Sequence, residues 1–220
     1  MPWYDGPNVV ETLDAFETPT LPEDAPLRFA VQDIYKFDER RIVAGRVESG
    51  RVEVGENIVF TPNQKSAVVE SIERWSAPSR DFAKAGESVG LMLTEQLFIE
   101  RGHIASPDPD KHPDATPNTQ PSETKRFHAN VFWMGKDSLE LGESYKLKLA
   151  TQEVECTVAE IVRVMDGATL ELDDKEREAI GRYDVAEVVI ETKHKVAVDP
   201  HDVNQSLGRF VLVDDYDVSG

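Results

Sequence analysis

Residue types that bind phosphate or catalyse reactions occur in this sequence without the spacing that such chemistry needs. A phosphate-binding loop needs glycines whose backbone can approach the phosphates, followed by Lys and a hydroxyl residue that reaches magnesium. The glycine-containing segment 86–90 has the wrong continuation, residues 135–137 form a Gly-Lys-Asp turn between expected strands, and G-x-x-x-x-G-K-[ST] occurs nowhere. We therefore expect no nucleotide site of the P-loop kind in this chain.

Metal binding and acid–base chemistry lack support for the same reason. The single cysteine and the five histidines form no compact ligand pattern. Cys156 shares a strand face with Val154 and Val158, so we interpret it as a packed core thiol rather than a nucleophile. The carboxylates within residues 214–217 stand near the carboxyl end and are expected to stay hydrated. We predict no catalytic, cofactor-binding or metal-binding residue here.

The net charge of -18 is spread unevenly along the chain. Residues 1–25 hold six acids and no Lys or Arg, residues 26–108 are nearly balanced, and residues 124–220 carry 20 acids against 12 bases. Nucleic-acid binding depends mostly on the attraction of Lys and Arg to phosphate, so we expect no general nucleic-acid binding. Arg40, Arg41, Arg46 and Arg51 are close in sequence; a solvated face is the ordinary interpretation, and a local basic surface is the alternative.

Length and composition indicate a globular protein of two domains. The 220 residues are enough for two compact units, and no stretch approaches the ~18 apolar residues of a membrane span. The amino terminus lacks the basic start and apolar run of a secretory signal, and one cysteine cannot form an internal disulfide. We expect a cytoplasmic protein that does not contact a membrane.

The order of the expected elements gives an all-β fold of two β-barrels preceded by a short amphipathic helix. Residues 1–25 are expected to form that helix and a Pro-containing linker, with Asn8 as the cap and an apolar stripe of Val9, Val10, Leu13 and Phe16. Alternation with period two predicts a first barrel over residues 26–108, with strands at 28–35, 41–48, 57–61, 66–75 and 88–93. Four prolines mark residues 109–123, with Pro107 just before them, as a linker.

A second barrel is expected over residues 124–220. Its predicted strands are 127–133, 144–149, 153–164, 169–172, 184–192 and 209–213. One or two helical turns are expected at 174–180.

A family resemblance rests on short motifs across nearly the whole chain. Residues 1–7, Met-Pro-Trp-Tyr-Asp-Gly-Pro, resemble the segment that leaves the GTPase domain in elongation factor 1-alpha-like proteins. The motifs at 44–50, 54–56, 85–90 and 99–104 are similar to the second domain of translation-factor-type GTPases. Each glycine in them stands where a hairpin needs a permissive backbone.

The second half resembles the third domain of the GTPase subunit of sulfate adenylyltransferase. The resemblance rests on Phe-His-Ala-Asn-Val-Phe-Trp-Met at 127–134, Tyr-Lys-Leu-Lys at 145–148 and Leu-Gly-Arg-Phe-Val-Leu-Val-Asp at 207–214. The Trp-Met pair and the Phe-Val-Leu-Val-Asp ending favour this family over true elongation factors, although Leu-Gly-Arg-Phe occurs in both. The sequence stops about where that family begins its last strand, so an incomplete final barrel is expected.

The resemblance implies a non-catalytic part of a GTPase whose hydrolysis drives formation of adenosine 5'-phosphosulfate from ATP and sulfate. GTP and Mg would belong to a GTPase domain outside these residues, and some members continue into an adenylylsulfate kinase domain. The implied partners are that GTPase domain and the catalytic sulfate adenylyltransferase subunit. Two rivals remain: a translation elongation factor fragment that contacts aminoacyl-tRNA, and a free-standing enzyme with a site in a barrel cleft.

Six residues are candidates for contacts between domains or with a partner: Trp3, Tyr4, Arg40, Arg41, Trp133 and Met134. Trp133 ends an expected strand before a turn at Gly135, which would bring its ring to the domain rim as an interface anchor. Burial in the core is the alternative for the same ring.

Overall fold

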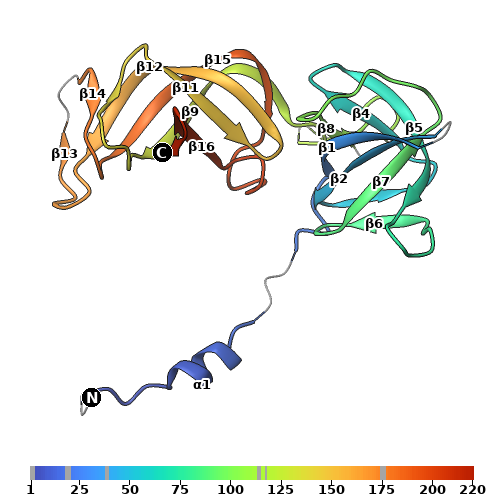
Figure 1. Cartoon of the computed structure of the whole chain (residues 1–220), viewed down its shortest axis with the longest axis horizontal. Coiled ribbons are helices and arrows are strands. Elements are labelled where there is room, and N and C mark those ends of the chain that lie inside the picture. Colours follow the sequence, from blue (N-terminus) through green and yellow to red (C-terminus); the bar gives the residue numbers. More distant parts are fainter. Residues whose placement is uncertain (1–2, 18–20, 38–39, 113–114, 117, 174–176) are drawn as a thin grey trace.

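The computed structural model describes residues 3–17, 21–37, 40–112, 115–116, 118–173 and 177–220. A short helix, α1 (Val9–Asp14), is followed by two β domains that lie side by side (Figure 1). The first domain contains β1 (Arg28–Phe37), β2 (Arg40–Ser49), β3 (Arg51–Glu53), β4 (Asn57–Thr61), β5 (Lys65–Glu73), β6 (Phe82–Lys84), β7 (Ser88–Leu93) and β8 (Ile104–Pro107). The second contains β9 (Ser122–Phe132), β10 (Leu139–Glu140), β11 (Ser144–Leu149), β12 (Gln152–Met165), β13 (Leu172–Asp173), β14 (Ala179–Ile180), β15 (Val185–Val198), β16 (Phe210–Asp214) and β17 (Asp217–Val218).

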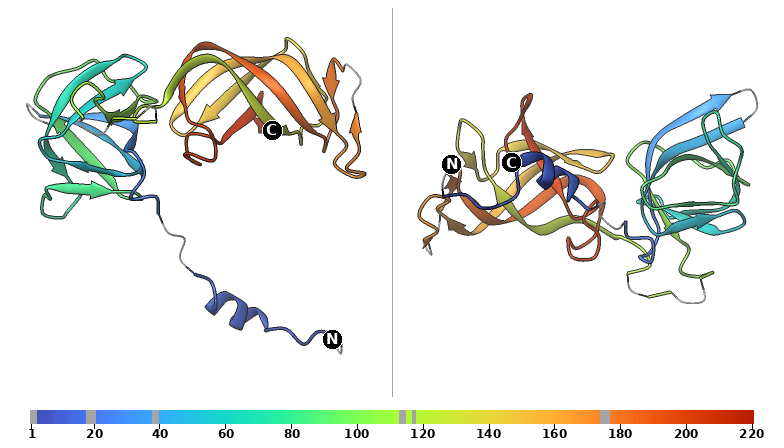
Figure 2. Two further views of the ribbon diagram at one scale, coloured as in Figure 1. Left: turned by 180° about the vertical axis from the view of Figure 1, so that it is seen from behind. Right: turned by 90° about the horizontal axis from the view of Figure 1, so that it is seen from below.

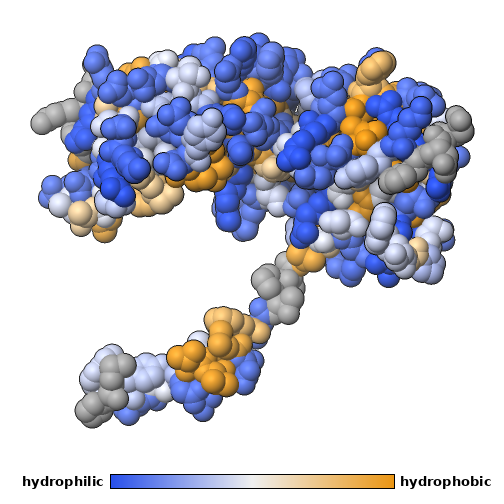
Figure 3. Space-filling model, in the orientation of Figure 1, coloured by the Kyte–Doolittle hydropathy of each residue, from blue (hydrophilic) through white to orange (hydrophobic). Residues whose placement is uncertain are grey.

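Helix α1 begins at the predicted cap. The Asn8 side chain accepts a hydrogen bond from the Glu11 backbone N–H, and the Glu11 carboxylate accepts one from the Asn8 N–H, so both partners of a capping box are present. All helical residues are exposed, and α1 stands away from both β domains in Figure 1. The apolar side chains predicted for one stripe gather on its surface in Figure 3.

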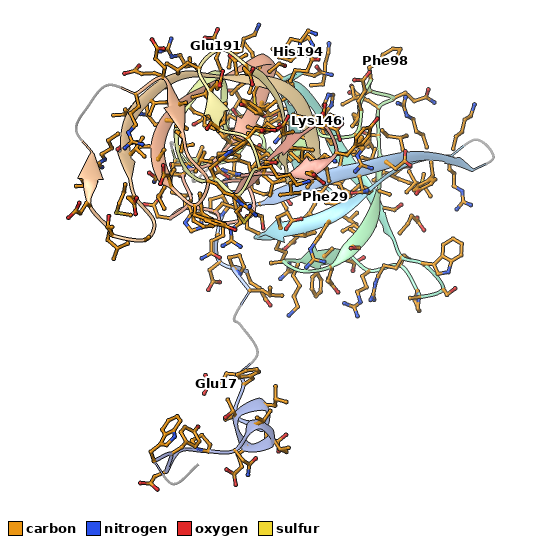
Figure 4. All side chains as sticks on the ribbon, turned by 60° about the vertical axis from the view of Figure 1, so that its left-hand side comes forward. Glu17, Phe29, Phe98, Lys146, Glu191 and His194 are labelled. Atoms are coloured by element: carbon orange, nitrogen blue, oxygen red, sulfur yellow. The ribbon has the colours of Figure 1, made fainter. Side chains whose placement is uncertain are left out.

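The first domain is a closed barrel in the strand order β1-β2-β7-β5-β4-β8, which returns to β1. Strand alternation explains its core: from Val43 to Ser49 of β2 every second residue is buried, and in β5 the alternation shifts by one residue at the bulge between Val69 and Ser71. Phe29 lies among these strands in Figure 4, and a Cβ at Gly45 would collide with its ring and the Ala30 carbonyl. The strands surround the core as a ring in the view from below (Figure 2).

The second domain is a curved sheet in the order β17-β16-β11-β12-β15-β9, with β13 paired to β12. Its strand ladder is open between β9 and β17 within the described residues, in line with the incomplete final barrel that the sequence led us to expect. The two edges meet through main-chain hydrogen bonds, because the Met134 and Gly135 N–H groups both donate to the Ser219 carbonyl. The buried face of β11 alternates strictly with an exposed face that carries Lys146 and Lys148.

The expected helical turns at 174–180 are wrong in their described part. Ala179 and Ile180 form β14, which pairs antiparallel with Leu139 and Glu140 of β10; residues 174–176 lie outside the described residues. Ile180 is fully buried in the second core. Tertiary packing of this side chain therefore overrides the local helical pattern.

A buried arginine fastens the two domains to each other. Arg28, 1% exposed at the start of β1, donates from Nε and Nη2 to the two carboxylate oxygens of Asp199, at 2.7 and 3.0 Å. It also donates to the carbonyls of Leu27, Asn118 and Thr119 at 3.0, 2.8 and 2.9 Å. These five bonds use all five guanidinium N–H groups. The end of the Pro-rich connector is thus held by the first barrel.

Apolar and neutral polar contacts complete the interface. Four buried residues, two from each domain, form one cluster: Ala30, Ile104, Ala197 and Leu207. Beside it the Asn204 amide donates to the Ser49 hydroxyl at 2.8 Å, and that hydroxyl donates to the Pro26 carbonyl at 2.7 Å. The pair of domains therefore forms one unit with a packed interior contact.

Candidate functional site on the first barrel

The predicted contact residues are dispersed over the molecule. Trp3 and Tyr4 are exposed near the amino terminus and form an edge-to-face pair with ring centroids 6.0 Å apart. The Tyr4 hydroxyl donates to the Pro7 carbonyl at 2.8 Å, which fixes the chain ahead of α1. Arg40 and Arg41 begin β2 on the first barrel. The structure does not bring these four residues together with Trp133 and Met134, which lie in the second domain.

Trp133 is a core residue, so its hypothesised role as a partner contact is wrong. Its side chain is 0% exposed, its ring packs edge-to-face on Tyr145 at 5.5 Å, and its Nε1 donates to the Asp137 carbonyl at 2.8 Å. The chain turns back so that Gly135 and Gly220 lie against the ring, where a Cβ on either would be too close. Met134, the next residue, is 42% exposed and stays a candidate contact.

A cavity of about 850 Å³ lies on the outer face of the first barrel, over β2, β7 and β5. Ala44 of β2 pairs with Gly90 of β7, and Gly90 pairs with Glu73 of β5, so one row of small and acidic residues crosses the cavity. A Cβ on Gly90 would collide with the Ile42 side chain. Because Gly90 has no side chain, the space above β7 at this position stays open as part of the cavity.

Cationic side chains surround this hollow. Arg40, Arg46 and Arg74 line it together with a single acid, Glu73. The Arg46 Nε lies 3.8 Å from the Glu48 carboxylate, a long ion pair, and the Glu73 carboxylate accepts a hydrogen bond from the Ser71 hydroxyl at 2.9 Å. A positive site of this kind on a chain of net charge -18 favours an anionic ligand at this one place.

Two exposed aromatic rings stand at the same cavity. Tyr35 near the end of β1 is 46% exposed, and Trp75, two residues after β5, is 91% exposed. A smaller cavity of about 220 Å³ adjoins this region and shares Arg40 as a lining residue; Arg41 lines only the smaller one. Arginines beside exposed rings are the combination that binds single-stranded nucleic acid, since the guanidinium contacts phosphate and the ring stacks on a base.

The chemical groups that this site presents are guanidinium groups and aromatic rings. The described residues contain no group of three or more His, Cys, Asp or Glu that could hold a metal. Burial raises the pKa of the Cys156 thiol to about 12, and the side chain is buried among the second core, which confirms the packed-thiol interpretation. No helix in the described part of the chain is long and apolar enough to cross a membrane.

Sequence reasoning identified Arg40 and missed most of the cavity. Arg46 was noted only as part of an arginine-rich segment and Gly90 only as part of a glycine-containing motif, and Tyr35 and Trp75 were not singled out as contact candidates. The alternation Ile42, Ala44, Arg46 on one strand face was the available signal. It could not reveal that Gly90 and Glu73 lie beside this face, because strand pairing is non-local.

Comparison with known proteins relates the whole chain to one group. Residues 126–220 match the family "GTP-eEF1A C-terminal domain-like". Elongation factor 1-alpha of Saccharolobus solfataricus is 33% identical over 97% of this chain and 48% of its own length. Sulfate adenylyltransferase subunit 1 of Shewanella oneidensis is 28% identical over 97% of this chain and 43% of its own length. The chain thus spans about half the length of these relatives.

Other elongation factors 1-alpha match at 30% or 31% identity. The crystal structure of sup35 complexed with GDP shares the fold, with a TM-score of 0.78, 22% identity, and coverage of 99% of this chain and 51% of that one. The all-β fold with its barrel, second sheet and short helix is therefore the expected one. Elongation factor names outnumber the sulfate adenylyltransferase name that the second half of the sequence favoured.

Proposed function

We propose that this chain, which corresponds to the second and third domains of the elongation factor 1-alpha-like family, holds the single-stranded end of an aminoacyl-tRNA at the arginine-lined cavity. Chemistry on GTP and Mg would belong to a GTPase domain outside these 220 residues. The two barrels would then act as a binding unit without a catalytic group of their own. This function replaces sulfate adenylyltransferase support as the first interpretation.

The observation that carries the proposal is the grouping of three arginines and two exposed rings around one cavity. A single strand presents unstacked bases and bendable phosphates, which such a cavity can contact at the same time. A duplex presents a regular ladder of phosphates, which would need an extended basic face. On the described surface of this acidic chain, lysines such as Lys146 and Lys193 are instead paired with carboxylates, those of Glu153 and Glu155.

Charge makes the proposed binding local. The first barrel region, residues 26–108, has 13 acids and 11 bases, whereas residues 124–220 carry eight more acids than bases (20 against 12). Phosphates are therefore repelled from most of the surface and attracted at the cavity. Three phosphate contacts to a single strand would give a salt dependence of about -2 in log K against log salt.

Fluorescence anisotropy with a 5'-labelled single-stranded RNA ending in the tRNA sequence CCA tests this function. Binding should weaken between about 50 mM and about 200 mM salt, and a duplex of the same strand should bind less well. Arg46→Ala should reduce the salt slope by about 0.7, the contribution of one phosphate. Arg126→Ala, which removes an exposed arginine from the second domain, is the matched control and should change little. Equal binding of duplex and single strand, or no binding, would refute the proposal.

The second candidate function is support of sulfate adenylyltransferase as part of its GTPase subunit. The 28% identity with Shewanella oneidensis subunit 1 over nearly the whole chain favours it, as does the acidity of the second half. In that case the chain should bind the catalytic sulfate adenylyltransferase subunit in sedimentation experiments, and Met134→Asp should weaken the complex because Met134 is an exposed candidate contact. An unchanged sedimentation profile on mixing the two proteins would exclude it.

A further inference from the structure

Trp75 is the most exposed tryptophan of the chain, and it stands at the rim of the arginine-lined cavity. Its side chain is 91% exposed, compared with 74% for Trp3 and 0% for Trp133. Leaving an indole in water forfeits the burial of a large apolar surface, so this position gains nothing for folding from a tryptophan. The neighbouring Glu73 and Arg74 also line the cavity, which places the ring beside a cationic group.

The loop that carries Trp75 is held at both ends. Ile72 and Arg80 form an antiparallel bridge across its base, and Arg80 pairs with Glu87 at 3.3 Å. Ser76, directly after the tryptophan, has a φ of 52°, in the left-handed region that few residues other than glycine adopt. The backbone of this loop thus carries Trp75 at the cavity, with the indole exposed to solvent.

We propose that Trp75 is a stacking platform for one base of a single-stranded nucleic acid whose phosphates lie on the cavity arginines. The inference rests on the proposed function and adds a specificity-determining residue to it. The occupant is a nucleic acid rather than a protein because Arg40, Arg46 and Arg74 surround the same hollow in an otherwise acidic chain. Stacking tolerates any base, so Trp75 confers preference for unpaired over paired strands.

A double-mutant cycle, which combines Trp75→Ala in the protein with removal of one base from the RNA, isolates the stacking contact. The probe is the 5'-labelled single-stranded RNA ending in CCA, with an abasic residue placed at each of its last positions in turn. Trp75→Ala should weaken binding of the intact RNA about 5- to 150-fold, the change that corresponds to ~1–3 kcal/mol per stacked base. At one abasic position the substitution should have no further effect. Trp75→Tyr should restore most of the affinity, and Tyr216→Ala, which removes an exposed ring from the second domain, should leave it unchanged.

The outcomes separate the two proposals. If the wild type binds the RNA and Trp75→Ala binds it equally well, the stacking role of Trp75 is overturned, whereas the proposed function stands. A loss that is equal for intact RNA and for every abasic RNA also overturns it, because Trp75 would then act through the loop or through another contact. Absence of binding by the wild type overturns both. Far-ultraviolet circular dichroism of each variant verifies that the barrel is folded.

Discussion

The contact between the two β domains should depend on Arg28 far more than on any surface ion pair. Arg28→Met keeps most of the side-chain length and removes all five donors of the guanidinium. The Asp199 carboxylate, whose side chain is 4% exposed, then stays buried without its cationic partner. Removing one member of such a pair costs about 3–5 kcal/mol, because the remaining charge is neither hydrated nor paired.

The double variant Arg28→Met with Asp199→Leu separates the charge from the rest of the contact. Without either charge the desolvation penalty disappears, so the double variant should be more stable than the sum of the single effects predicts, by about 2–3 kcal/mol. It should still be less stable than the wild type. The buried carbonyl of Thr119 loses its donor in every Arg28 variant, and an unsatisfied buried carbonyl costs about 1–3 kcal/mol.

Urea unfolding with two probes measures these free energies. The change in tryptophan fluorescence on unfolding reports mainly on the second core, because Trp133 is buried there whereas Trp3 and Trp75 are already exposed in the folded chain; far-ultraviolet circular dichroism reports on both domains. The two curves should coincide for the wild type and separate for Arg28→Met, since the domains lose their coupling. Arg126→Met, which disrupts an exposed pair with Glu160 at 3.7 Å, is the control and should cost less than about 1 kcal/mol. If each single substitution, Arg28→Met or Asp199→Leu, lowered the free energy of unfolding by less than about 1 kcal/mol and the two effects simply added in the double variant, the two side chains would not be energetically coupled.

Three further outcomes follow from the described residues. Cys156, with its pKa raised by burial to about 12, should react with a thiol reagent only as fast as the second domain opens, and fast labelling of the native protein would contradict its place in the core. Trypsin should cleave first after the exposed Lys111. The two fragments should still co-elute in size-exclusion chromatography, because Arg28 and the apolar cluster hold the domains together, and their separation would contradict that interface. Burial lowers the pKa of His103, so below pH 6.5 the unfolded chain binds a proton that the folded chain does not, and stability should fall as the pH drops. His103→Gln should flatten this part of a plot of melting temperature against pH. An unchanged plot would contradict the role of His103.

Long strands were predictable because alternation is a local property. The expected strands 57–61, 88–93 and 144–149 coincide with β4, β7 and β11. Strands of two or three residues, such as β3, β6 and β10, were missed because period two cannot be recognised over so few positions. The closed first barrel followed from the density of strands, whereas the open edge in the second ladder depends on pairings that no local pattern contains.

The position of Trp133 shows why site prediction from local pattern failed. A tryptophan at a strand end before a turn fits both an anchor at the rim and a core ring. Trp133 is buried because the main chain of Ser219 and Gly220, more than eighty residues later in the sequence, lies against this part of the sheet. Trp75 is the converse case: its expected place inside a strand ending at 75 suggested nothing unusual, but β5 ends at Glu73 and leaves the ring exposed.

Arg28 can affect a ligand at the cavity only indirectly, by keeping the two domains in a fixed arrangement. A nucleic-acid strand bound at the cavity, as proposed, would continue away from the first barrel, and the position of the second domain would then limit the directions that it can take. Because residues 124–220 carry eight excess acids (20 against 12), any path that runs close to the second sheet is electrostatically unfavourable. Arg28 should therefore influence ligand binding although it is 1% exposed and touches no ligand: releasing the second domain would relax this restriction and weaken the preference for single strands before it weakened affinity itself.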